Sequence, residues 1–165
     1  MTLECICGII LHMTRLSNKR LHSQISDLHS WLQQRGYDLK FHGNAIDQVN
    51  FQDETVYINS KQKLENQYYT LLHECGHVYA FENQDDWLTD LPLSKQKLTS
   101  SLDGRSERSN AFRVSQLAEE IDAWRIGRII ADNLDHKINL TRYNKMYGDC
   151  VWSYIKDYTE SKNKK

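Results

Sequence analysis

The residues best suited to chemistry lie in one short run, His73-Glu74-Cys75-Gly76-His77. This is an H-E-x-x-H pattern, in which two histidines stand four positions apart and a glutamate directly follows the first. On an α-helix, residues four apart share a face, so both imidazoles can reach one metal ion at about 2.0–2.1 Å. Glu74 lies about 100° further round the helix, where it can take a proton from a metal-bound water. The pattern predicts zinc ligation by His73 and His77, with Glu74 as the general base.

The run lies within a stretch, from about 64 to 81, whose apolar residues recur at helical spacing. These residues are Leu64, Tyr68, Leu71, Cys75 and Val78. At 100° per residue the two histidines come out nearly opposite this stripe, so the helix is expected to turn them toward a cleft. The alternative is a helix whose solvated polar face carries two histidines and a glutamate and binds nothing.

Two histidines leave a catalytic zinc site incomplete, because such a site normally has three protein ligands and one water. A second helix, from about 110 to 133, is predicted by the spacing of Val114, Leu117, Ile121 and Trp124. If those residues face the core, Glu119 points away from it, whereas Glu120 borders the buried side. A carboxylate at a core boundary is costly without a positive partner, and a zinc ion would supply one. Glu120 is therefore the predicted third ligand.

The remaining elements are expected to be helices around a small sheet. Helical spacing predicts an N-terminal helix over 17–35 and a C-terminal helix over about 143–158. Alternation of apolar and polar residues over 37–59 predicts a small, mostly antiparallel sheet. The predicted fold class is therefore α+β.

Two polar segments complete the expected organisation. Residues 82–109 show no sustained period and contain Pro92 and the Asp103-Gly104 turn pair, so they are expected to form a long loop inserted between the two ligand helices. Residues 160–165 are expected to be a solvated tail. A length of 165 residues suits a single domain over 1–165.

Composition excludes several other classes of protein. The 21 basic and 22 acidic residues give a net charge of −1, which offers no general attraction to nucleic acid or to an acidic membrane. The apolar stretch from Cys5 to Leu11 is too short to span a bilayer and reads poorly as a signal peptide. Four cysteines do not form the pattern of a secreted disulfide framework. We therefore expect a cytoplasmic protein.

Together, these segments resemble the gluzincin metallopeptidases, in particular the compact minigluzincin and ImmA/IrrE-type proteins of bacteria and their phages. The resemblance covers roughly 55–81, with the H-E-x-x-H run, and 110–131, with Glu120-Ile121-Asp122-Ala123. In that family the first glutamate of an E-x-[E/D]-A pattern is the third zinc ligand, a role that falls on Glu120. The resemblance implies a zincin-like fold, one zinc ion per chain and hydrolysis of peptide bonds in a protein or peptide substrate. A regulatory protein is one class of target that it suggests.

The chain also departs from the family pattern. Many gluzincins carry Asp or Asn four residues after the ligand glutamate to orient a zinc histidine, but this chain has Trp124 there, with Asp122 as an alternative. A SprT-like arrangement would instead recruit His136 as the third ligand. The resemblance further makes residues 56–59 the sheet edge along which an extended substrate pairs. The donor to the oxyanion stays open among Tyr79, His136, Tyr143 and Tyr147.

A function of a different class would use the same residues without catalysis. A zincin scaffold that keeps zinc for folding could bind a partner through its cleft or through the 82–109 loop. That loop is expected to be either a lid over the cleft or a plain surface loop. The presence of Glu74 favours the enzyme, because a purely structural metal site needs no general base.

Overall fold

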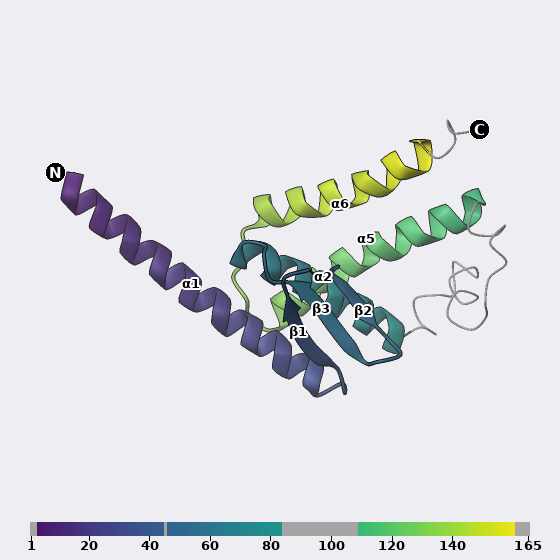
Figure 1. Ribbon diagram of the computed structural model, residues 1–165, viewed down its shortest axis with the longest axis horizontal. Coiled ribbons are helices and arrows are strands. Elements are labelled where there is room, and N and C mark those ends of the chain that lie inside the picture. The colour runs from purple at the N-terminus through teal and green to yellow at the C-terminus, as the bar shows by residue number, and fades with distance from the viewer. Residues whose placement is uncertain (1–2, 45, 84–108, 161–165) are drawn as a thin grey trace. The chain divides into compact units, whose positions relative to one another are not determined.

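A computed structural model describes residues 3–44, 46–83 and 109–160, with side chains from residue 17 onward (Figure 1). The described residues form four helices and one three-stranded sheet, which confirms the predicted α+β class. In chain order the elements are α1 (Leu3–Gln33), β1 (Asp38–His42), β2 (Gln48–Asn50), β3 (Thr55–Asn59), α2 (Leu64–Glu82), α5 (Asn110–Asn133) and α6 (Leu140–Glu160). Most of the expected 82–109 loop and of the expected 160–165 tail lies outside the described residues.

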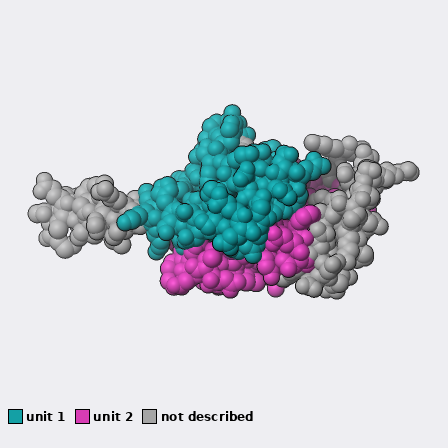
Figure 2. Space-filling view, turned by 90° about the horizontal axis from the view of Figure 1, so that it is seen from below, with its two compact units in different colours: residues 1–74 teal, residues 75–165 magenta. Residues whose placement is uncertain are grey.

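The chain divides into two compact units, Met1–Glu74 and Cys75–Lys165, which Figure 2 colours separately. The first contains α1, the sheet and the N-terminal part of α2. The second contains the rest of α2 together with α5 and α6. The boundary falls inside α2, between Glu74 and Cys75, and the helix continues through it without a break.

In the first unit, the C-terminal half of α1 supplies a large part of the core. Leu21, Leu28 and Leu32 are buried at the predicted helical spacing. The helix ends at Gln33, and the turn after it contains Gly36, whose φ of 84° lies in the left-handed region that favours glycine. The helix begins at Leu3 rather than near 17 as predicted, so it is much longer than expected. No helix among the described residues is long and apolar enough to cross a membrane.

The sheet differs from the prediction in strand direction. Its order is β1-β3-β2, and β3 pairs parallel to β1 over five residues but antiparallel to β2 over only three. The sheet is therefore mixed, and the prediction of a mostly antiparallel sheet was wrong. Alternation predicts which face of a strand is buried, but it carries no information about the direction of the neighbouring strand.

The position of β3 also corrects the expected substrate edge. β3 lies between the other two strands: Thr55, Val56 and Tyr57 pair with both β1 and β2, whereas Ile58 and Asn59 pair with β1 alone. Val56 and Ile58 are fully buried, as suits a central strand. The expectation that residues 56–59 form a sheet edge for an extended substrate was wrong, because β3 is the central strand.

In the second unit, α5 and α6 lie side by side (Figure 1) and run in opposite directions. Near one end, the Tyr143 hydroxyl donates to the backbone oxygen of Trp124 at 2.6 Å, and the rings of Trp124 and Tyr147 stack at 6.0 Å. Near the other end, the Tyr158 hydroxyl donates to Oε1 of Gln116 at 3.0 Å. These contacts set the register of the two helices.

The buried face of α5 is rotated from the predicted one. Val114 was expected in the core but is exposed. The buried residues of this helix include several small ones: Ser115, Ala123, Gly127 and Ala131. Small residues four apart form a shallow row on a helix that allows a neighbouring backbone to approach closely. A prediction based on hydrophobicity alone gives too little weight to such residues.

Candidate metal centre

Helix α2 carries the two histidines, and it is buried on all sides from Tyr68 to Gly76. His73 is only 6% exposed and Glu74 only 5%, so the polar residues are buried with the apolar ones. The alternative of a solvated polar face is therefore wrong for His73 and Glu74. Burying such groups is costly unless they have polar or charged partners.

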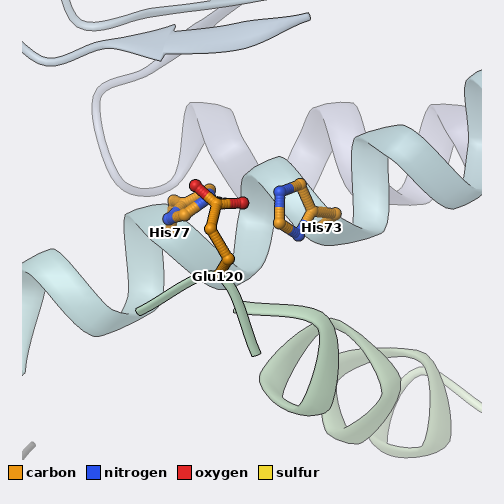
Figure 3. Close-up of side chains that lie close together, drawn as sticks. All are labelled: His73, His77 and Glu120. Atoms are coloured by element: carbon orange, nitrogen blue, oxygen red, sulfur yellow. Dashed lines mark ion pairs between the residues drawn. The ribbon is translucent and has the colours of Figure 1, made fainter. Parts of the chain in front are cut away.

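Glu120 on α5 lies beside His77 on α2, within the second unit. Nε2 of His77 and Oε2 of Glu120 are 3.7 Å apart, and the two side chains are 23% and 13% exposed. His73 stands one turn earlier on the same continuous helix. One donor atom from each of His73, His77 and Glu120 lies within 4.8 Å of the others, and Figure 3 shows the carboxylate next to the two rings. The structure thus brings together the three predicted ligands.

These donors fit a zinc ion in both type and spacing. Two imidazole nitrogens and one carboxylate oxygen form a common set of ligands for catalytic zinc. Bonds of about 2.0–2.1 Å at tetrahedral angles place two donors about 3.4 Å apart. The 3.7 Å between Nε2 of His77 and Oε2 of Glu120 is close to that value, and the donor atom of His73 lies within 4.8 Å of both. Among the described residues, no second group of three such side chains is found.

Gly76 explains how α5 comes close enough to supply Glu120. A Cβ atom at Gly76 would overlap the backbone oxygen of Ala123 and lie 2.8 Å from its carbonyl carbon, closer than real Cβ atoms are found. The backbones of α2 and α5 are therefore in direct contact at this point. Gly76 directly precedes His77, and Ala123 lies about one turn after Glu120. This contact consequently sets the distance between the histidine and the carboxylate.

Two other predicted residues do not join the group. His136, the alternative third ligand, is 8% exposed but is not a member of the cluster. Asp122, considered as an orienting carboxylate, lies 3.4 Å from the guanidinium of Arg125, which is itself exposed. Trp124, which stands where many gluzincins have an acid or amide, is buried against Tyr143 and Tyr147.

The structure narrows the list of oxyanion donors. The Tyr143 hydroxyl donates to the backbone oxygen of Trp124 and is buried, so it is already used in joining α5 to α6. Burial is the main reason that the pKa of Tyr143 is raised well above its ordinary value. Its role is therefore structural. The described contacts do not place Tyr79, Tyr147 or His136 at the three donors.

Tyr154 on α6 is a residue of the site that the sequence did not predict. It lies one turn before Tyr158, so the register of α5 and α6 places it opposite Glu120. Burial, followed by the negative charge of Glu120, raises the pKa of Tyr154 far above its ordinary value. Its signal was present, because four tyrosines of α6 are spaced for one helix face: Tyr143, Tyr147, Tyr154 and Tyr158. A phenol on a packed face needs an acceptor.

Comparison with protein-family models, with curated proteins and with solved structures found no match for this chain. The description of the centre therefore depends on its own donors and their geometry. Two histidines from α2 and one glutamate from α5 converge, with a buried glutamate next to the first histidine and a tyrosine of α6 placed opposite the third donor.

Proposed function

We propose that this chain is a zinc-dependent hydrolase that cleaves peptide bonds in a protein or peptide substrate. His73, His77 and Glu120 would hold the ion, one per chain, and Glu74 would act as the general base. The observation that carries the proposal is the convergence of three donors from α2 and α5 beside a buried glutamate. The resemblance of the H-E-x-x-H and E-x-D-A runs to gluzincins supports the choice of peptide bonds.

In this proposal the three clustered residues would bind the ion, and Glu74 would transfer the proton. When bound, zinc supplies Lewis acidity, which lowers the pKa of a coordinated water to about 7 and polarises a carbonyl oxygen. Glu74 lies outside the three clustered donors, so its carboxylate would accept a proton from the attacking water rather than hold the ion. The same carboxylate then returns the proton to the leaving amine. Its burial keeps the proton from exchanging freely with solvent.

The substrate proposal includes a revised place for strand pairing. Since β3 is paired on both sides, an extended peptide would have to add to an outer strand of the sheet, β1 or β2. We propose a cytoplasmic protein or peptide as the substrate, and a regulatory protein is one class that the family resemblance suggests.

The variant Glu74→Gln tests the proposed mechanism. We expect wild-type protein to contain about one zinc per chain by elemental analysis and to cleave an unstructured protein such as casein. Glu74→Gln should keep the zinc and lose at least about 100-fold in cleavage rate, because an amide cannot act as the base. Glu82→Gln, near the end of the same helix, should retain both properties.

Two results would contradict this mechanism in different ways. Undiminished cleavage by Glu74→Gln would remove Glu74 as the base. Zinc in the wild-type protein without any turnover would instead favour the non-catalytic zincin scaffold, which keeps the metal for folding and binds a partner.

A further inference from the structure

The contacts between α5 and α6 follow a regular antiparallel register. The Tyr143 hydroxyl donates a hydrogen bond to the backbone oxygen of Trp124, and the ring of Tyr147 stacks on the ring of the same tryptophan. Tyr158 lies three turns after Tyr147 on α6, and Gln116 lies about two turns before Trp124 on α5. The Tyr158 hydroxyl donates a hydrogen bond to Gln116. Moving toward the C-terminus of α6 therefore means moving toward the N-terminus of α5.

This register places Tyr154 opposite Glu120. Tyr154 lies one turn before Tyr158, and Glu120 lies one turn after Gln116, so the two pairs follow each other along the antiparallel helices. The rings of Tyr154 and Tyr158 lie 6.3 Å apart, as neighbours on one face. The negative charge of Glu120 contributes to the raised pKa of Tyr154, in agreement with this placement.

We infer that Tyr154 is a positioning residue, whose hydroxyl holds the Glu120 carboxylate in place to complete the metal centre. This inference rests on the proposed role of Glu120 as a ligand. A carboxylate has two oxygens and about four lone-pair sites, so it can accept the phenol and still bind a metal ion. Partners that hydrogen-bond to a metal ligand fix its orientation. In many gluzincins an acid four residues after the ligand glutamate orients a zinc histidine, and this chain has Trp124 at that position. Tyr154 would instead orient the ligand Glu120 itself.

The fixed end of α6 explains how Tyr154 can act in this way. The Arg113 guanidinium donates to the backbone oxygen of Tyr158 at 3.3 Å and lies over its ring at 5.3 Å. Together with the hydroxyl of Tyr158 on Gln116, these contacts tie α6 to α5 one turn beyond Tyr154. The phenol of Tyr154 is therefore presented to Glu120 by a helix that is anchored on either side of it.

The test compares Tyr154→Phe with Tyr158→Phe in the full chain. Each variant removes one hydroxyl from the same helix face and keeps the ring. The dissociation constant for zinc is measured by competition with a chromogenic chelator, and the visible spectrum of the cobalt-loaded protein reports on ligand geometry. We expect Tyr154→Phe to weaken zinc binding about 10- to 100-fold and to alter the cobalt spectrum. Tyr158→Phe should change the constant by less than about threefold, because the Arg113 contacts with the backbone oxygen and the ring at position 158 still hold this end of α6.

A double-variant cycle with Glu120→Ala separates positioning from general destabilisation. If the phenol acts through the carboxylate, Tyr154→Phe should weaken zinc binding no further once Glu120 is gone. An unchanged zinc constant and cobalt spectrum in Tyr154→Phe would overturn the inference and leave the proposed function standing. A wild-type protein that binds no zinc would overturn both. Zinc binding that depends on Tyr154 without any peptide cleavage would refute only the proposed function.

Discussion

At the scale of single residues, Glu120 is distinguished from its neighbour by position rather than by chemistry. Glu119 and Glu120 carry the same group, but the carboxylate of Glu120 lies 3.7 Å from the His77 ring and opposite Tyr154 in the register of α5 and α6. His136 has a chemically suitable side chain and is buried, but it does not belong to the cluster. Identity as a ligand therefore depends on which donors the helices bring to one point.

The zinc dissociation constants of variants at these positions should distinguish a metal ligand from a residue that does not bind the ion. Glu120→Ala is expected to weaken zinc binding by more than about 100-fold, because losing a mere hydrogen-bonding partner of a ligand already costs about 10- to 100-fold. Glu119→Ala and His136→Ala should leave the constant within about threefold of wild type. Equilibrium competition with a chelator measures all three. A larger loss in His136→Ala than in Glu120→Ala would assign the third ligand to His136 instead.

At the scale of elements, the centre depends on a close crossing of α2 and α5. Gly76 has no side chain, and the facing residue is Ala123, so the two backbones touch. A bulkier residue at Gly76 would push α5 away from α2. The distance between Glu120 on α5 and the histidines on α2 would then increase. The glycine in the H-E-C-G-H run is therefore needed for helix packing and not for chain flexibility.

The variant Gly76→Ala tests this packing. The new Cβ would lie 2.8 Å from the carbonyl carbon of Ala123. Overpacking of this kind costs about 1–3 kcal/mol of unfolding free energy, and it outweighs the gain of up to about 1 kcal/mol in helix propensity. Zinc affinity should fall together with stability.

Gly148→Ala is the matched control for this variant. Gly148 also lies inside a helix, α6, but a Cβ there would meet nothing within 4 Å. This variant should be neutral or more stable by up to about 1 kcal/mol, since it gains helix propensity alone. Urea denaturation compares the two glycines. Equal stabilisation of both variants would show that α2 and α5 do not pack as closely as described.

The pairing of α5 with α6 should weaken at alkaline pH. Burial raises the pKa of Tyr143 above the ordinary value of about 10, so the folded state keeps a proton that the unfolded state loses. The contribution to stability is complete below pH 10 and falls as pH rises above it, by up to about 1.4 kcal/mol per pH unit. Urea denaturation between pH 9 and pH 11 should show this slope. Tyr143→Phe should be less stable at neutral pH but should have a shallower slope, and an unchanged slope would contradict the assignment.

At the scale of the whole molecule, the proposed metal centre would couple metal binding to folding. The histidines of α2 and Glu120 lie about 40 residues apart in sequence, so only the folded chain brings them together. An ion that binds the folded chain in preference to the unfolded chain stabilises it by mass action. This coupling is expected whether the centre is catalytic or structural.

Zinc should therefore raise the melting temperature of the chain. Free zinc at 100 times its dissociation constant is expected to add about 2.7 kcal/mol, which corresponds to about 5–11 °C for a protein of this length. Calorimetry with zinc and with a chelator measures the shift. Glu120→Ala should show little shift at the same zinc concentration. A shift of equal size in that variant would mean that zinc stabilises the chain from another site.

The sequence by itself predicted α2, α5 and the three side chains that the structure brings together. Helical spacing located α2 and α5, and the H-E-x-x-H spacing placed two imidazoles on one face, because both depend on local helix geometry. Glu120 was selected by its place beside a buried face. The observed face of α5 is rotated from the predicted one, and Glu120 nevertheless lies close to His73 and His77.

Only the tertiary structure decided the features that depend on contacts between distant segments. The parallel pairing of β1 with β3 and the central place of β3 depend on strand neighbours, which alternation does not encode. The buried face of α5 follows from the close approach at Gly76, a packing effect of small residues that hydropathy overlooks. The partnership of Tyr154 with Glu120 follows from the register of α5 and α6, which no local pattern contains. The spacing of residues determines the local geometry of a helix or strand. The contacts between helices and strands depend instead on how well their side-chain surfaces pack together.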